Sequence, residues 1–305
     1  IYRFDNLNVI ACCANHLEHA KEKAEKYGIL ACTYEEILAD PSIDMVVILT
    51  PAPTHEVLIR QALEVGKHVY TEKTMTLSAK TANALQELAL AQNLFLGSAP
   101  DTFLGAALQT AKKAIDNGLI GEVTSFDICA NRDLDYLAGL SQFLCMPGGG
   151  ICYDYSVYHL TALISLLGPV DSVSAIVRNL APERINTFPD SPTYGKPISY
   201  PNESQVFSIL KLENGIAGTL SINGDSTIQD QALIGMGAIV LNGAKIGKGS
   251  MIAAGALVPQ NTVVPDGALY MGNPAKFRRM LTEEELTANL KNAANYIKES
   301  KDLNN

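Results

Sequence analysis

The sequence lacks several features that would place it in a large class of proteins. It has no run of about 18 apolar residues, so a membrane-spanning helix is not expected. Its six cysteines form no CxxC pair and have no histidine nearby at zinc-finger spacing, which predicts reduced thiols in a cytoplasmic protein. Basic residues are also fewer than acidic ones. The 23 Lys and Arg against 32 Asp and Glu leave a net charge of −9, which argues against nucleic acid or an anionic membrane as partner.

The first third of the chain alternates short apolar runs with helical patterns. We expect strands near residues 7–13, 29–33, 45–49, 68–70 and 95–97, and helices near 17–27, 34–39, 56–65 and 78–92. Strands that alternate with helices are typical of a parallel, doubly wound sheet. Residues 1–98 are therefore predicted to form a Rossmann-like α/β domain.

One stretch of this domain, Thr50–Thr74, delivers polar residues after two successive strands. Ligands of open parallel sheets bind at the carboxyl ends of the strands. We therefore expect one polar rim at that edge, made by Thr50, Thr54, His55, Glu72 and Lys73. The alternative is an ordinary turn with a solvated charge pair.

The pattern changes over residues 99–222. We expect helices at 102–117 and 154–167, strands at 122–130, 170–178, 205–212 and 217–222, and an irregular loop at 186–203. Asn214-Gly215 between two apolar runs is a strong hairpin signal. These features predict an α+β domain in which helices cover a mixed sheet.

From Ile222 onward, apolar residues recur every sixth position, with a small residue or Thr between most of them. The apolar series is Ile222, Ile228, Ile234, Val240, Ile246, Ile252, Val258, Val264 and Tyr270. This rhythm predicts a left-handed parallel β-helix over residues 223–305. Thr282 and Glu285 form a capping box for a last helix that should run to about Ser300.

The motifs of residues 1–222 resemble the Gfo/Idh/MocA family of oxidoreductases. They are TPAPTH at 50–55, GKHVYTEKT at 66–74, APDTFLG at 99–105, IDNGLIGEV at 115–123 and GGGICYDYSVYHLTAL at 148–163. The resemblance implies an oxidoreductase that uses NAD or NADP and acts on a sugar or other polyol. It also implies cofactor-binding residues beside the nicotinamide, namely Thr50, Pro51, Thr54, His55, Glu72 and Lys73. The family's catalytic Lys-Asp-His set maps onto Lys73, Asp154 and Tyr158, with His159 one residue beyond.

The chemistry of these side chains suits that reaction. Removing a hydride from a carbinol leaves a proton, which a nearby base must take. Lys73 can polarise the oxygen or share its proton, Asp154 can orient it, and Tyr158 or His159 can relay it to solvent. On an α-helix Asp154 and Tyr158 would share a face, whereas His159 would point elsewhere, which favours Tyr158. The alternative for His159 is packing against the sheet.

The chain also departs from the family pattern. No GxGxxG loop for the cofactor pyrophosphate is present, and Ala14 stands where an acidic residue for the ribose is expected. Thr74 replaces the usual proline, and Tyr158 replaces the usual histidine. Impaired cofactor binding is therefore one expectation for this chain.

The last portion resembles γ-class carbonic anhydrase-like proteins, through residues 234–259 and 272–285. Such proteins are trimers that bind zinc through histidines, but no histidine follows His159, and Gly224 occupies a ligand position. We expect no metal, and a surface for homo-oligomer formation. Two alternatives to an enzyme stay open. One is a non-catalytic assembly protein driven by the β-helix, and the other is a hybrid chain joined near residues 222–227.

Overall fold

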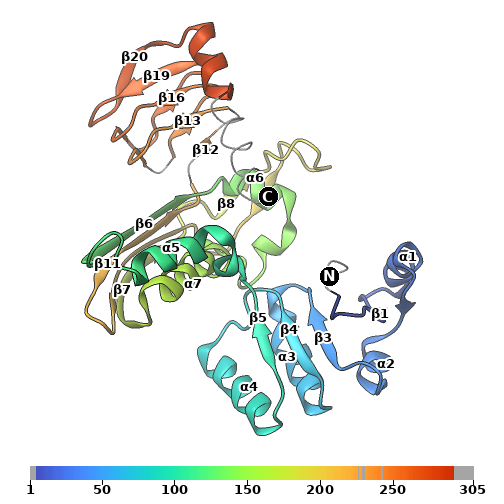
Figure 1. The fold of residues 1–305 in the computed structure, drawn as a ribbon. Helices are drawn as coiled ribbons and strands as arrows, with labels where there is room; N and C mark the ends of the chain where they lie inside the picture. Colours follow the sequence, from blue (N-terminus) through green and yellow to red (C-terminus); the bar gives the residue numbers. More distant parts are fainter. Residues whose placement is uncertain (1–4, 226, 229–230, 242, 292–305) are drawn as a thin grey trace. The chain divides into compact units, whose positions relative to one another are not determined.

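The computed structural model describes residues 5–225, 227–228, 231–241 and 243–291 (Figure 1). The chain divides into two compact units. The first runs up to Lys113 and includes Leu160–Ser165, and the second comprises Ala114–His159 and the residues from Leu166 onward. Among the described helices, none is long and apolar enough to cross a membrane.

The first unit contains the predicted alternation of strands and helices (Figure 1). Its elements are β1 (Ala11–Cys12), α1 (Leu17–Tyr27), β2 (Leu30–Ala31), α2 (Tyr34–Ala39), β3 (Met45–Ile48), α3 (Ala52–Glu64), β4 (His68–Thr71), α4 (Ala79–Ala91) and β5 (Leu96–Ser98). β3, β4 and β5 form one parallel sheet, and β1 pairs with β2 in a second parallel pair. A Rossmann-like α/β arrangement is confirmed.

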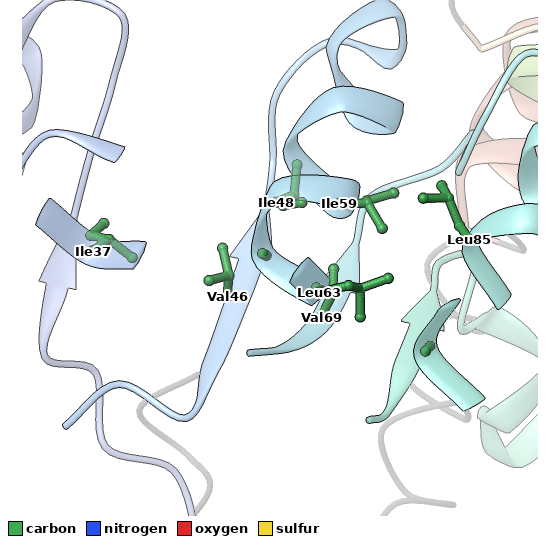
Figure 2. Close-up of a cluster of buried hydrophobic side chains, with 9 residues drawn as sticks. Ile37, Val46, Ile48, Ile59, Leu63, Val69 and Leu85 are labelled. Atoms are coloured by element: carbon green, nitrogen blue, oxygen red, sulfur yellow. The ribbon is translucent and has the colours of Figure 1, made fainter. Parts of the chain in front are cut away.

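The core of this unit is made where α3 and α4 pack on the β3–β4–β5 sheet. Ile59, Leu63, Val69 and Leu85 are fully buried (Figure 2). Each such side chain contributes about 1.5–3 kcal/mol through its removal from water. This burial holds the ends of β3 and β4 in register, which fixes the loops that follow them.

Local signals explain where several helices begin and end. α1 stops at Gly28, whose φ of 66° is left-handed, as its helical pattern predicts. α2 begins with a capping box between Thr33 and Glu36. The expected start of one helix was wrong. α3 begins at Ala52 rather than near residue 56, because Pro51 and Pro53 are compatible with a helix N-terminus.

The expected single helix 102–117 is also interrupted. It divides into a 3₁₀ turn, η1 (Thr102–Leu104), and α5 (Ala106–Asp116). Gly105 between them has an extended backbone with ψ of 151°, which ends the turn. Both sides of Gly105 are helical, as the periodicity predicts, but the periodicity carries no sign of the break.

The second unit contains a four-stranded mixed sheet in the order β6-β11-β10-β7. Its strands are β6 (Ser125–Asn131), β7 (Val170–Arg178), β10 (Gln205–Leu212) and β11 (Ala217–Asn223). β6 runs parallel to β11, while β10 is antiparallel to both of its neighbours. The Asn214-Gly215 hairpin joins β10 to β11, with Gly215 at φ of 89°, as predicted.

Shorter elements complete this part of the unit. They are α6 (Leu134–Leu140), η2 (Gln142–Cys145), η3 (Ile151–Tyr155), β8 (Glu183–Ile185), β9 (Pro197–Ser199) and α7 (Ser156–Leu167), whose Leu160–Ser165 belong to the first unit. β9 lies within the loop that was expected to be irregular, and it pairs antiparallel with β8. The prolines of the loop hid this pairing, since proline lowers the expectation of a strand.

The hexapeptide region forms short strands at the predicted spacing. They are β12 (Thr227–Ile228), β13 (Leu233–Ile234), β14 (Ile239–Val240), β15 (Lys245–Ile246), β16 (Met251–Ile252), β17 (Leu257–Val258), β18 (Val263–Val264) and β19 (Ala268–Met271). They pair in parallel as three separate ladders, β12-β15-β18, β13-β16-β19 and β14-β17. Every third strand is thus a neighbour in space, as a coil of three six-residue steps requires.

The apolar series supplies the core of these ladders. Ile246, Ile252 and Val258 are fully buried, whereas Ile228 at the first ladder is 36% exposed. Ile222 lies in β11 of the mixed sheet, so the series begins one strand before the ladders do. β20 (Lys276–Met280), which the sequence did not predict, pairs antiparallel with β19.

The predicted capping box of the last helix is present. Thr282 N donates to Glu285 Oε2 at 2.9 Å, and Glu285 N donates to Thr282 Oγ1 at 3.2 Å. The helix occupies residues 283–291. Its expected continuation to Ser300 lies outside the described residues.

Candidate active site

The carboxyl ends of β3 and β4 bring the predicted rim residues side by side. The two strands pair Ile48 with Thr71, and Glu72 N donates to Ile48 O at 2.8 Å. The residues that follow each strand, Thr50 and Lys73 among them, therefore leave the sheet at the same edge. This is the edge at which parallel α/β sheets bind ligands.

His55 ties the two strand-end loops together. Its side chain is fully buried, its Nδ1 lies 2.8 Å from Thr74 O, and its Nε2 lies 2.6 Å from Thr50 O. Both ring nitrogens are thus occupied by the backbone of the chain. The geometry gives His55 a positioning role behind the rim, rather than a ring nitrogen exposed to a ligand.

Hydroxyl and carboxylate groups make the exposed part of this rim. Thr50 Oγ1 and Thr54 Oγ1 lie 2.6 Å apart, and Thr54 Oγ1 donates to Pro51 O at 2.8 Å. Glu72 Oε2 accepts a hydrogen bond of 3.0 Å from the backbone N–H of Lys73. Thr50, Pro51 and Thr54 are at least partly exposed, and the side chains of Glu72 and Lys73 are half-buried. The rim is therefore a set of fixed polar groups open to a ligand.

In the second unit, the candidate residues start from the glycine turn 148–150. A Cβ at Gly150 would lie 2.2 Å from the carboxylate of Glu203, and one at Gly149 would lie 2.5 Å from the backbone of Phe143 and Leu144. Only glycine permits these close approaches. The turn therefore leads directly into η3, and both lie against Glu203.

Glu203 holds the start of η3, a role that sequence reasoning missed. Its Oε1 accepts hydrogen bonds from Cys152 N at 3.0 Å and Tyr153 N at 3.4 Å, and its backbone oxygen accepts one from Ile151 N at 3.1 Å. A carboxylate at the N-terminus of a helical turn satisfies amides that lack a partner within the turn. No local signal could have found it, because Glu203 lies about fifty residues away in sequence.

The helix expected over 154–167 begins differently. Residues Ile151–Tyr155 form a π-helical turn in which Ser156 N donates to Ile151 O, and α7 starts only at Ser156. Asp154 lies in the π turn and Tyr158 in the α-helix, so the α-helical angle that favoured Tyr158 over His159 does not apply. π turns are frequent at functional sites.

His159 lies against the ring of Tyr155, which is part of a small stack. The Tyr155 ring meets the His159 ring edge-on at 5.0 Å, lies 6.3 Å from the Tyr158 ring, and has the Arg132 guanidinium over its face at 4.3 Å. Burial, and then the positive charge of Arg132, lower the pKa of His159 below its usual 6.5. Sequence reasoning named His159 and Tyr158, but it missed Arg132 and Tyr155.

The residues present suit the nicotinamide end of a dinucleotide. The rim offers hydroxyl groups, a carboxylate and an ammonium group at the carboxyl edge of a parallel sheet, the chemistry and the place that such a ligand uses. No cluster of three or more His, Cys, Asp or Glu suited to a metal ion occurs among the described residues.

Comparison with known proteins agrees with this architecture. Residues 1–98 match the model of an oxidoreductase family with an NAD-binding Rossmann fold. Residues 108–237 match the GFO/IDH/MocA C-terminal domain, so two domains of one family follow each other over more than half of the chain. This chain belongs to the Gfo/Idh/MocA oxidoreductase family. Residues 225–260 match the bacterial transferase hexapeptide (six repeats).

Individual relatives cover the chain only in part. An uncharacterised oxidoreductase of Schizosaccharomyces pombe is 36% identical over 46% of this chain and 38% of its own length. The scyllo-inositol 2-dehydrogenase (NAD(+)) of Bacillus subtilis is 28% identical over 71% of this chain and 60% of its own. The crystal structure of a putative myo-inositol dehydrogenase from Sinorhizobium meliloti matches with a TM-score of 0.58 and 25% identity, over 72% of this chain and 62% of that chain. This chain therefore spans about half the length of the curated relatives it matches.

Proposed function

We propose that this chain is an NAD(P)-dependent oxidoreductase that interconverts a hydroxyl and a carbonyl group on a sugar or polyol. The observation that carries the proposal is the polar rim at the carboxyl ends of β3 and β4, within a chain whose two family domains occur in the expected order. The inositol dehydrogenase relatives support the substrate class. When bound, the nicotinamide would supply the hydride acceptor.

The side chains named from the sequence take the remaining roles. Lys73, in the loop that follows β4, polarises the reacting oxygen and shares its proton. Asp154 in η3 orients that oxygen, and Tyr158 or His159 passes the proton to solvent. Thr50, Pro51, Thr54 and Glu72 would border the nicotinamide, while His55 fixes the loops that carry them. Proton transfer by positioned groups of this kind contributes about 10²–10⁴-fold to a rate.

Cofactor binding tests the proposal most directly. NADH and NADPH would be titrated against the purified chain by fluorescence, alongside the variants Thr54→Val and Leu90→Ala. Thr54 lies on the rim, whereas Leu90 is an exposed residue of α4. We expect one nucleotide to bind, with weaker binding in Thr54→Val alone. Absence of binding for both nucleotides would refute the oxidoreductase proposal for this chain.

A second function is favoured by the hexapeptide region. Three large apolar side chains, Met236, Ile239 and Val263, are 89%, 46% and 64% exposed. We infer that the three ladders are the faces of a left-handed parallel β-helix and that exposed apolar residues on these faces, Val263 among them, join copies of the chain into a homo-oligomer. Sedimentation of the wild type and of Val263→Glu tests this. A monomeric wild type would reject it, whereas dissociation caused by the glutamate would support it.

A further inference from the structure

Three side chains in the second unit form a stack at one edge of the mixed sheet. Arg132 follows the last residue of β6, and its backbone N–H donates to Asn223 O at 2.8 Å. Its guanidinium lies 4.3 Å from the centroid of the Tyr155 ring, which in turn meets His159 at 5.0 Å and 90°. The stack therefore joins the end of β6 to the turn that carries Asp154.

Arg132 differs from Arg184 and Arg279, two other arginines of this unit, in having no carboxylate partner among the described residues. Arg184 pairs with Asp135 and Asp225, and Arg279 pairs with Glu285. Within the described part of the chain, no carboxylate pairs with the Arg132 guanidinium. Stacking uses the face of a guanidinium and leaves its in-plane N–H groups available, in the fork that matches a carboxylate.

His159 has an unused polar atom beside this arginine. Its Nε2 is buried and has no hydrogen-bond partner among the described residues. A buried polar atom of this kind calls for a ligand or a water. Because the pKa of His159 is lowered, the ring is neutral near pH 7, and a neutral ring can exchange a hydrogen bond with a hydroxyl group.

We propose that Arg132 and His159 form a subsite for a sugar or polyol that carries a carboxylate. Arg132 binds the carboxylate through its N–H fork, and His159 Nε2 forms a hydrogen bond with a neighbouring hydroxyl group. One guanidinium balances one negative charge, which fits a carboxylate better than a phosphate dianion. The inference rests on the proposed function, because it names the substrate class on which that function would act.

Matched sugar pairs test the subsite. D-glucuronate with D-glucose, and D-galacturonate with D-galactose, differ only in a carboxylate for a hydroxymethyl group. Their binding would be measured by calorimetry with the wild type, Arg132→Gln and Arg132→Lys. Arg178→Gln is the matched control, because Arg178 also lies over an aromatic ring, that of Phe207 at 5.8 Å.

We expect each acidic sugar to bind the wild type about 10-fold to 100-fold more tightly than its neutral partner, the range of a charge-assisted hydrogen bond. Arg132→Gln should abolish this preference, Arg132→Lys should retain part of it, and Arg178→Gln should leave it unchanged. Circular dichroism of each variant shows whether it is folded. If Arg132→Gln is unfolded, Arg132→Lys is used to test the subsite in its place.

Three results would overturn the subsite: no acid preference in the wild type, no binding of either sugar, or equal weakening of both sugars by Arg132→Gln. Tighter binding of D-glucose 6-phosphate than of D-glucuronate would overturn the carboxylate assignment. NADH titration of the same samples separates the two proposals. If NADH binds and no acid preference is found, only the subsite fails. If neither NADH nor NADPH binds, the oxidoreductase proposal itself fails.

Discussion

The β3–β4–β5 sheet and the hexapeptide ladders are both parallel, yet they place polar side chains very differently. In the sheet, a long crossover helix separates successive strands, and the chain leaves each strand through a loop that can carry Thr50 or Lys73. In the ladders, two-residue strands follow one another through short turns, many with a glycine at left-handed φ, such as Gly237 and Gly249. Parallel pairing alone therefore does not create a candidate ligand site. The loops next to a long crossover helix supply the polar side chains of such a site.

Replacing Lys73 should give the largest effect, because it removes a proposed catalytic group from the loop that follows β4. In Lys73→Met, we expect the rate of polyol-dependent NAD(P) reduction to fall about 10²–10⁴-fold, since the group that shares the proton is lost. The measurement is steady-state nicotinamide absorbance at a saturating polyol concentration.

The matched control for this change is Lys245→Met. Lys245 is an exposed lysine in β15. The control should keep the wild-type rate, and both variants should unfold like the wild type. Equal losses of rate in Lys73→Met and Lys245→Met would show that the sheet has no special role in the chemistry.

The two regions should also differ in how they respond to a lost core side chain. Leu63 and Val258 are both fully buried, the first between α3 and the sheet and the second inside the ladders. Leu63→Ala should cost about 2–5 kcal/mol in free energy of unfolding, from lost burial and a cavity. Val258→Ala removes fewer atoms and should cost roughly 2 kcal/mol.

Hydrogen exchange shows which elements each substitution destabilises. Leu63→Ala should raise exchange in β3, β4 and α3, because their shared core is weakened. Val258→Ala should raise it in the neighbouring ladders only, since repeats are stabilised mainly by adjacent steps. Exchange that spreads across both regions in either variant would contradict separate cores.

The sequence predicted the two regions unequally well, for physical reasons. The apolar spacing of Ile246, Ile252 and Val258 repeats without interruption, so one pattern fixed all the ladders. The Rossmann-like helices were found with similar accuracy where a cap marked the end, as Gly28 does for α1. At α3 the start was misplaced, because Pro51 and Pro53 are typical of turns and of helix N-termini alike.

The candidate site was predicted only where a motif is local. Glu72-Lys73 and the Asp154–His159 segment could be read because each follows directly from its neighbours in the chain. Glu203 and Arg132 could not, because Glu203 meets the amides of η3, and Arg132 meets the Tyr155 ring, only in three dimensions. The expected division at residues 98/99 and 222/223 remains a prediction.

Glu203 provides the next test, since it holds in place the turn that carries Asp154. In Glu203→Ala, the amides of Cys152 and Tyr153 lose their acceptor. We expect a loss of about 1–3 kcal/mol in free energy of unfolding, the usual cost of unsatisfied donors. Chemical denaturation measures it, and Glu203→Gln, which retains an acceptor oxygen, should lose less. A stability equal to that of the wild type in Glu203→Ala would refute the role given to this carboxylate.

The smallest effect is expected at the end of the hexapeptide region, where Glu285 forms hydrogen bonds with the guanidinium of Arg279 at 2.7 Å and caps the last helix. The hydrogen bonds from Arg279, and then that from the Thr282 backbone, lower the pKa of Glu285 from 4.5 to about 2. A lowered pKa in the folded chain means that the stabilisation is present above pH 4.5 and is lost as pH falls toward about 2. The effect should be small, because the pair is exposed and its charges are screened by solvent.

An NMR titration of the Glu285 carboxyl should show a midpoint well below 4.5 in the wild type and closer to 4.5 in Arg279→Gln. If both proteins titrate alike, the ion pair does not hold the cap, and the terminal helix depends on packing alone.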